Sequence, residues 1–134
     1  MPRGSVMGRL TLRATGPARP EAVWRRYACV DQWASWSPQI RAVHTAGRRL
    51  TAGMSGTVES VVGLRVAFVV DSVDDDHHIW TWRVRLGAAG LRLRHDVRGH
   101  ADGSTTSLTM HGPWLVVLGY APLARLALRR LVRP

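Results

Sequence analysis

A change of hydrophobic period near residue 113 restricts the fold of this chain more than any other feature. Between Thr57 and His111, apolar and polar residues alternate in five segments, separated by short stretches that contain Gly or Asp. This pattern is typical of half-buried β-strands joined by hairpin turns. From residue 113 to 134, the apolar residues instead recur at helical spacing. A run of antiparallel strands before one long helix predicts a sheet that curls around that helix.

The residues before this run add one strand, two short helices and a further strand. Val6–Arg13 and Ile40–Thr45 alternate like strands, and residues 16–30 and 31–38 read as helices. The sequence therefore predicts an α+β fold in one domain, residues 1–134. About seven antiparallel strands would form a curved sheet around the C-terminal helix, with the two short helices after the first strand.

The basic residues limit the chemistry that the chain can perform. All nineteen are arginine, and the absence of lysine excludes Schiff-base catalysis and a P-loop lysine. The net charge of +10 would suit a nucleic acid, but the arginines are spread along the chain without a long run. A solvated arginine surface explains that spread better, so nucleic-acid binding is the least favoured function.

Cysteine use and hydropathy indicate a cytoplasmic protein. Cys29 is the only cysteine, so no disulfide forms within the chain, and a reducing compartment fits. The first ten residues lack the apolar core of a signal peptide. The most apolar run, residues 113–124, is too short for a bilayer, which needs about 20 residues.

The segment ARPEAVWRRYACVDQWASWSP, residues 18–38, holds a Val-Trp pair, an Asp, a Trp and then Trp-Ser-Pro. In this pattern the chain resembles the START-like (SRPBCC) helix-grip superfamily, in particular its polyketide cyclase/dehydrase and lipid-transport branch. The resemblance covers nearly the whole chain, although GAAGLRLRHDV and DGSTTSLTM match the last strands more loosely. It implies a large apolar cavity between the sheet and the C-terminal helix. Family members bind lipids, polyketides, quinones or hormones there, and only some are enzymes.

The expected hairpins allow the inner wall of that cavity to be predicted. A four-residue loop at Gly87–Gly90 and a two-residue turn at Asp102-Gly103 would align three strands. One face then carries two cross-strand rows: Trp82, His95 and Met110, followed by Trp80, Val97 and Leu108. This face is apolar apart from His95, so it is the expected concave wall. The proposed ligand-binding residues are Trp33, Trp36, Phe68, Trp80, Trp82 and Met110.

His95 and a carboxylate are the candidate catalytic residues. A histidine on an apolar wall could serve as a general acid or base, or could simply be hydrogen-bonded to a neighbour. A turn at Gly63-Leu64 and a three-residue loop at residues 74–76 would place Glu59 on the cavity side. A two-residue loop would place Asp71 there instead, because a one-residue slip reverses every side chain. Glu59 is preferred, since the alternative turns Phe68 outward.

Two classes of function remain open at this point. The preferred one is binding of a polyketide-, lipid- or quinone-like molecule, with cyclisation or dehydration as an added activity; the other is a non-enzymatic carrier. His77 and His78 lack a third ligand at useful spacing, so we expect no metal and no cofactor. The stripe of Leu123, Leu126, Ala127 and Leu131 on the last helix is expected to pack on the sheet, although a transient membrane contact stays open. The sequence does not indicate an oligomeric state.

Overall fold

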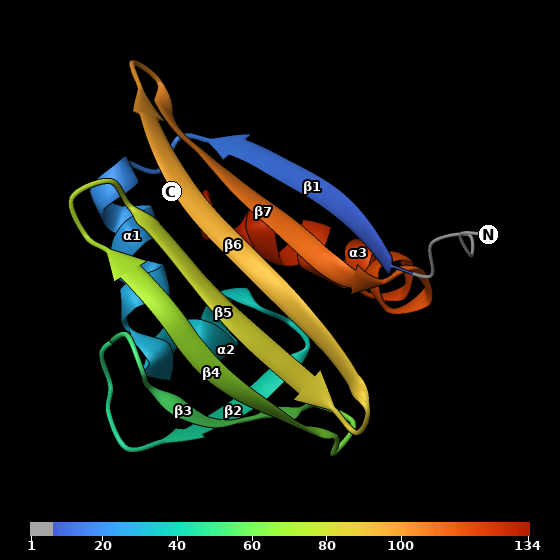
Figure 1. Ribbon diagram of the computed structural model, residues 1–134. Coiled ribbons are helices and arrows are strands. Elements are labelled where there is room, and N and C mark those ends of the chain that lie inside the picture. The colour runs from blue at the N-terminus through green and yellow to red at the C-terminus, as the bar shows by residue number, and fades with distance from the viewer. Residues whose placement is uncertain (1–6) are drawn as a thin grey trace.

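A seven-stranded antiparallel sheet wraps around a long helix in the computed structural model, which describes residues 7–134. The strand order is β1-β7-β6-β5-β4-β3-β2, so the first strand pairs with the last. Figure 1 shows the helices on one side of the curved sheet. The strands are β1 (Met7–Gly16), β2 (Ile40–Thr45), β3 (Ser55–Ser60), β4 (Arg65–Asp74), β5 (Ile79–Leu86), β6 (Ala89–His100) and β7 (Gly103–Pro113). The helices are α1 (Pro20–Ala28), the 3₁₀ turn η1 (Val30–Gln32), α2 (Trp33–Trp36) and α3 (Trp114–Leu131).

This architecture confirms the predicted helix-grip fold. The two short helices follow the first strand, and the last 18-residue helix lies in the grip of the sheet. Pro20 begins α1, where its missing N–H costs nothing, and α2 ends two residues before Pro38. Of the expected first strand, Val6 lies outside the described residues.

The hairpin turns differ from those predicted, yet the faces of β5, β6 and β7 are the expected ones. The β5–β6 turn holds two residues, with left-handed backbone at Gly87, so Trp80 pairs with His95 and Trp82 with Leu93. At the next hairpin, His95 pairs with Leu108. Each expected partner is therefore wrong by two positions. Because side chains alternate with period two, a shift of two keeps every residue on its predicted face.

The predicted register between β3 and β4 is wrong, and this error moves residues to the opposite face of the sheet. Glu59 pairs with Arg65, and Val58 pairs with Val66. The expected turn would have paired Glu59 with Phe68, whereas Gly56 is the residue opposite Phe68. The turn is longer than two residues, and this odd change in spacing sends Glu59 to the outer face of the sheet.

Helix α3 is only partly covered by the sheet. Ala127 and Leu131 of the expected apolar stripe are buried, but Leu123 and Leu126 are exposed. The prediction that the whole stripe packs on the sheet is therefore wrong. The helix also presents Leu115 and Leu118 to solvent, and Leu115 is 88% exposed. This apolar outer face needs an explanation beyond core packing.

Candidate functional site

A cavity of about 550 Å³ lies between the inner face of the sheet, α3 and the connection from α2 to β2. This volume falls within the range of about 300–1,000 Å³ that small-molecule sites occupy. Most of the lining side chains are aliphatic or aromatic. Of the described residues that line it, none is an arginine, an aspartate or a glutamate. The cavity therefore suits an apolar molecule despite the strongly basic chain.

The two tryptophans of α2 cap this cavity, and their indole N–H groups anchor them. Trp33 Nε1 donates to the Tyr27 carbonyl at 2.8 Å, and Trp36 Nε1 donates to the Arg26 carbonyl at 3.1 Å. Both carbonyls belong to the last turn of α1, where a helix leaves carbonyls without intrahelical donors. With its polar edge bonded to α1, each indole also lines the cavity.

The sheet supplies the opposite aromatic wall. Trp80 and Trp82 line the cavity as predicted, and both rings contact Trp33, with centroids 5.6 and 5.2 Å away. The placement of Phe68 and Met110 on the cavity surface is wrong. Both are buried in the core on the expected face of the sheet, and neither lines the cavity. Phe68 instead packs against Trp33 and Trp82, so it supports the wall.

His95 lies in this wall within a chain of hydrogen bonds whose direction is fixed. Thr106 Oγ1 donates its single proton to the Asp96 carbonyl at 2.9 Å, so it accepts from Tyr27 Oη at 2.6 Å. Tyr27 Oη then accepts from His95 Nδ1 at 3.2 Å. On the other side of the imidazole, Nε2 accepts from the Trp82 indole N–H at 3.1 Å. Both ring nitrogens are therefore occupied by protein groups.

This arrangement keeps the imidazole neutral. Burial lowers the pKa of His95 from 6.5 to about 3. A proton on Nε2 would also face the N–H of Trp82, donor against donor. Trp80 stacks on the imidazole with the two rings nearly parallel, at 4.5 Å between centroids. Burial likewise raises the pKa of Tyr27 above its ordinary value, so this hydroxyl remains protonated.

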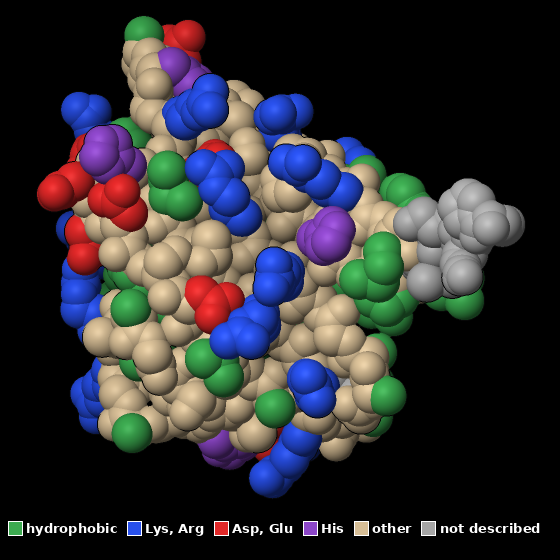
Figure 2. Space-filling model, in the orientation of Figure 1, with side chains coloured by type: hydrophobic (Ala, Val, Ile, Leu, Met, Phe, Trp, Pro, Cys, Tyr) green, Lys and Arg blue, Asp and Glu red, His purple; other side chains and the backbone are tan. Residues whose placement is uncertain are grey.

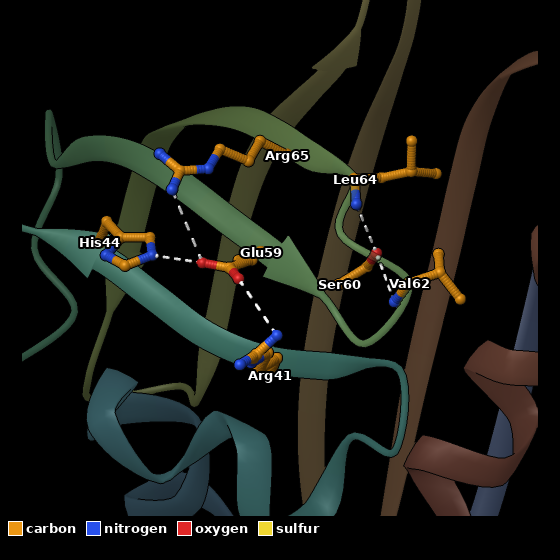
Figure 3. A network of polar contacts seen from close by, with 7 residues as sticks. All are labelled: Arg41, His44, Glu59, Ser60, Val62, Leu64 and Arg65. Atoms are coloured by element: carbon orange, nitrogen blue, oxygen red, sulfur yellow. Dashed lines mark hydrogen bonds and ion pairs between the residues drawn. The ribbon is translucent and has the colours of Figure 1, made fainter.

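Neither candidate carboxylate reaches the cavity, so the placement of Glu59 is wrong. Glu59 lies on the outer face, where His44 Nε2 is 2.9 Å from its carboxylate and Arg41 and Arg65 lie within 4 Å (Figure 3). The hydrogen bond from His44, followed by the two arginine charges, lowers the pKa of Glu59. Asp71, the alternative, forms an outer ion pair with Arg83 at 3.0 Å. Among the lining residues that the structure describes, His95 thus has no carboxylate beside it.

Exposed aliphatic side chains surround the mouth of the cavity. Ser60 Oγ accepts from the backbone N–H groups of Val62 and Leu64, which holds the β3–β4 turn (Figure 3). The exposed rim residues are Val61 at 58%, Val62 at 77%, Leu64 at 51% and, on α3, Leu123 at 43%. All four also line the cavity, so the rim and the interior form one continuous apolar surface.

A polar pair bridges the α2–β2 connection and α3 beside this rim. The side-chain Nε2 of Gln39 donates to Tyr120 Oη at 2.6 Å. The backbone carbonyl of Gln39 accepts from the backbone N–H of Val61 at 3.1 Å. Both side chains line the cavity. Gln39 Oε1 is buried, and within residues 7–134 no donor reaches it. Burial raises the pKa of Tyr120, with the bond from Gln39 acting in the opposite sense.

Sequence reasoning missed Tyr27, Thr106, Gln39 and Tyr120. The partners in these contacts are 68 to 81 residues apart, and no local pattern marks either member. The six tryptophans were a usable signal because such large rings must be buried somewhere. A tyrosine or glutamine that completes a polar contact across the fold gives no comparable signal.

The outer face of the sheet carries the arginines that the alternation predicts. Figure 2 shows basic side chains scattered over this face, with acidic side chains between some of them. Arg83 pairs across the strands with Arg92 and is neutralised by Asp71. The basic side chains in this view are dispersed and do not form one continuous patch, as expected for a solvated surface.

Within residues 7–134, no three His, Cys, Asp or Glu side chains gather as a metal site would require. No helix in that range is both long and apolar enough to cross a bilayer.

Comparisons with known proteins agree with the geometry. The family model described as polyketide cyclase / dehydrase and lipid transport matches residues 7–134. Among solved structures, the crystal structure of Ara h 8.0201 is similar, with a TM-score of 0.77 and 11% sequence identity. The match covers 93% of this chain and 95% of that one, and at this identity it shows the fold alone. No curated protein matches the sequence.

Proposed function

Since the chain belongs to the polyketide cyclase / dehydrase and lipid transport family, we propose that it binds a hydrophobic small molecule in its cavity. A polyketide-, lipid- or quinone-like ligand fits this proposal. The observation that carries it is the 550 Å³ cavity with aromatic and aliphatic walls and an apolar rim. Binding of an apolar ligand to such a surface is favourable because it removes apolar area from water. The lone Cys29 suits a reducing compartment, so we propose the cytoplasm as its location.

Binding is better supported than acid–base catalysis. Cyclisation or dehydration needs a group that exchanges protons near neutral pH. The pKa of His95 lies far below that range, and both of its nitrogens are bonded to protein groups. We therefore give His95 the role of fixing the wall, and propose a carrier or accessory protein ahead of a cyclase or dehydratase.

A specific observation favours a carrier that meets membranes. The rim of Val61, Val62, Leu64 and Leu123 continues to the exposed leucines of α3. Arg125 and Arg129 lie on the exposed side of that helix, and Arg65 lies at the base of the β3–β4 turn. A patch of aliphatic side chains flanked by arginine fits an anionic lipid surface. A second copy of a chain with net charge +10 fits it less well, because the two copies would repel.

The binding function can be tested with a pair of matched variants. Val66 lines the cavity on β4, whereas Val69 is exposed on the outer face of the same strand. Val66→Trp fills the cavity, and Val69→Trp adds the same ring outside it. We expect N-phenyl-1-naphthylamine, a neutral apolar dye, to bind the wild type and Val69→Trp alike and to bind Val66→Trp at least tenfold more weakly. Equal binding by all three proteins would exclude the cavity as the site.

The membrane contact has its own test. Flotation with vesicles that contain phosphatidylserine should recover the wild type, and Val62→Asp should reduce that recovery severalfold. Vesicles of phosphatidylcholine alone should recover little protein, because the arginines then lack anionic partners. Equal recovery on both kinds of vesicle would remove the electrostatic part of the proposal.

A further inference from the structure

The polar groups of the cavity indicate the charge and head group of its ligand. We propose that the ligand is an uncharged amphiphile whose hydroxyl group, or a similar group that both donates and accepts, bonds to Gln39 and Tyr120. This inference rests on the proposed binding function and narrows the class of ligand.

The Gln39–Tyr120 pair leaves part of its hydrogen-bonding capacity unused. Tyr120 Oη accepts from Gln39 Nε2, and this is the sole hydrogen bond found for the hydroxyl within the described part of the chain. The hydroxyl proton of Tyr120 is therefore available to a ligand. Gln39 Oε1 is buried beside it and accepts no bond from any residue between 7 and 134. A buried acceptor without a donor is unfavourable, so a ligand that supplies the donor gains affinity.

The unused donor and acceptor do not depend on which way the Gln39 amide faces. If the amide oxygen faced Tyr120, it would accept the tyrosine proton instead. The amide N–H groups would then be the free donors, and the lone pairs of Tyr120 Oη would be the free acceptors. In both orientations the pair offers at least one donor and one acceptor side by side. A hydroxyl, which has one proton and two lone pairs, matches both at once.

Among its described lining residues, the cavity holds no group that could balance a charge. Although the chain has nineteen arginines and nine acidic residues, none is among the described residues of the lining. His95 is neutral, and its two nitrogens are already bonded. Trp80 adds a buried indole N–H that has no acceptor among the residues that the structure describes. An ion in this cavity would lose its hydration without an opposite charge in return.

The position of the Gln39–Tyr120 pair also suits the head group of an amphiphile. Gln39 contacts the β3–β4 turn through its backbone, and Tyr120 lies one helical turn before the rim residue Leu123. The polar pair thus lies near the mouth, whereas Trp80, Trp82 and His95 form the wall on the sheet side. An amphiphile would enter with its apolar end first and leave its hydroxyl at Gln39 and Tyr120.

Four probes that share an unbranched ten-carbon chain test this inference at pH 8 by displacement of N-phenyl-1-naphthylamine: 1-decanol, its methyl ether, decanoate and decylammonium. We expect 1-decanol to bind several-fold more tightly than the ether, which accepts but does not donate, and at least tenfold more tightly than either ion. The preference over decanoate would oppose the net charge of the protein, which attracts anions. Decanoate binding as tightly as 1-decanol would overturn the inference.

Variants then assign the preference to the two residues. Tyr120→Phe and Gln39→Leu should remove the difference between alcohol and ether and leave the affinity for the ether within a few-fold. Gln39→Glu places a charge at the same position and should reverse the ranking toward decylammonium. If the alcohol preference survives in all three variants, the head-group site is wrong while the binding function stands. If neither the dye nor any probe binds the wild type, the binding function fails and this inference fails with it.

Discussion

Tyr27 and His95 are 68 residues apart in the sequence, and the tyrosine hydroxyl lies 3.2 Å from Nδ1 of the imidazole. One side chain comes from α1 and the other from the middle of the sheet. Their contact joins the short helices to the inner wall. It also selects the tautomer of His95, because Tyr27 has already donated its own proton to Thr106.

Removing the hydroxyl of Tyr27 should destabilise the fold. Tyr27→Phe leaves Thr106 Oγ1 without its buried donor and His95 Nδ1 without its buried acceptor, so we expect the free energy of unfolding to fall by about 1–3 kcal/mol. Urea denaturation measures this loss. The double variant with Thr106→Val should lose less than the sum of the two single changes, since both remove the same hydrogen bond. Additive losses would show that the two groups act independently.

The neutral state of His95 predicts how stability depends on pH. The pKa in the folded protein, about 3, lies below the value of 6.5 for a free histidine, so the unfolded chain takes up the proton first. Stability from this residue is complete above pH 6.5 and is lost as the pH falls toward 3. The expected loss approaches about 1.4 kcal/mol per pH unit below pH 6.

Unfolding in urea at pH 7.5, 5.5 and 4.5 measures this slope. His95→Gln should flatten it between pH 6 and 4.5, whereas His100→Gln, at an exposed position near the end of β6, should keep the wild-type slope. A His95→Gln protein with an unchanged slope would exclude the buried imidazole as its cause.

Loss of the Trp33 indole N–H should loosen the attachment of α2 to α1. Trp33→Phe leaves the Tyr27 carbonyl without its donor and also opens space between Trp80 and Trp82. We expect a loss of about 2–4 kcal/mol in the free energy of unfolding. Trp114→Phe is the matched control, because that side chain is partly exposed on α3 and should cost much less.

Glu59→Gln should leave ligand binding unchanged. Its carboxylate contacts His44, Arg41 and Arg65 on the outer face, so it has no route to the ligand. Dye affinity within twofold of the wild type is the expected result, measured beside Val66→Trp as a variant that should lose binding. A tenfold loss in Glu59→Gln would mean that the outer network shapes the cavity from behind.

The fold was predictable because its signals are local and repeated. Alternation along each strand, the change of period before α3 and the tryptophan pair near Pro38 each predict one element. The faces of Trp80, Trp82 and His95 were also correct, since two errors of two positions preserve inside and outside. Glu59 was misplaced because its hairpin contains more residues than the Gly63-Leu64 pattern suggests. The hydrogen-bond partners of His95 could not be predicted, because contacts between residues far apart in the sequence produce no periodic pattern.

The tryptophans around the cavity each hold their indole proton in a different setting. Those of Trp33 and Trp36 face two successive carbonyls of α1, that of Trp82 faces an imidazole nitrogen, and that of Trp80 has no acceptor within the described chain. In a proton NMR spectrum these four protons should therefore resonate at separate frequencies. When a ligand binds, the indole resonance that shifts would identify the part of the cavity wall that the ligand contacts.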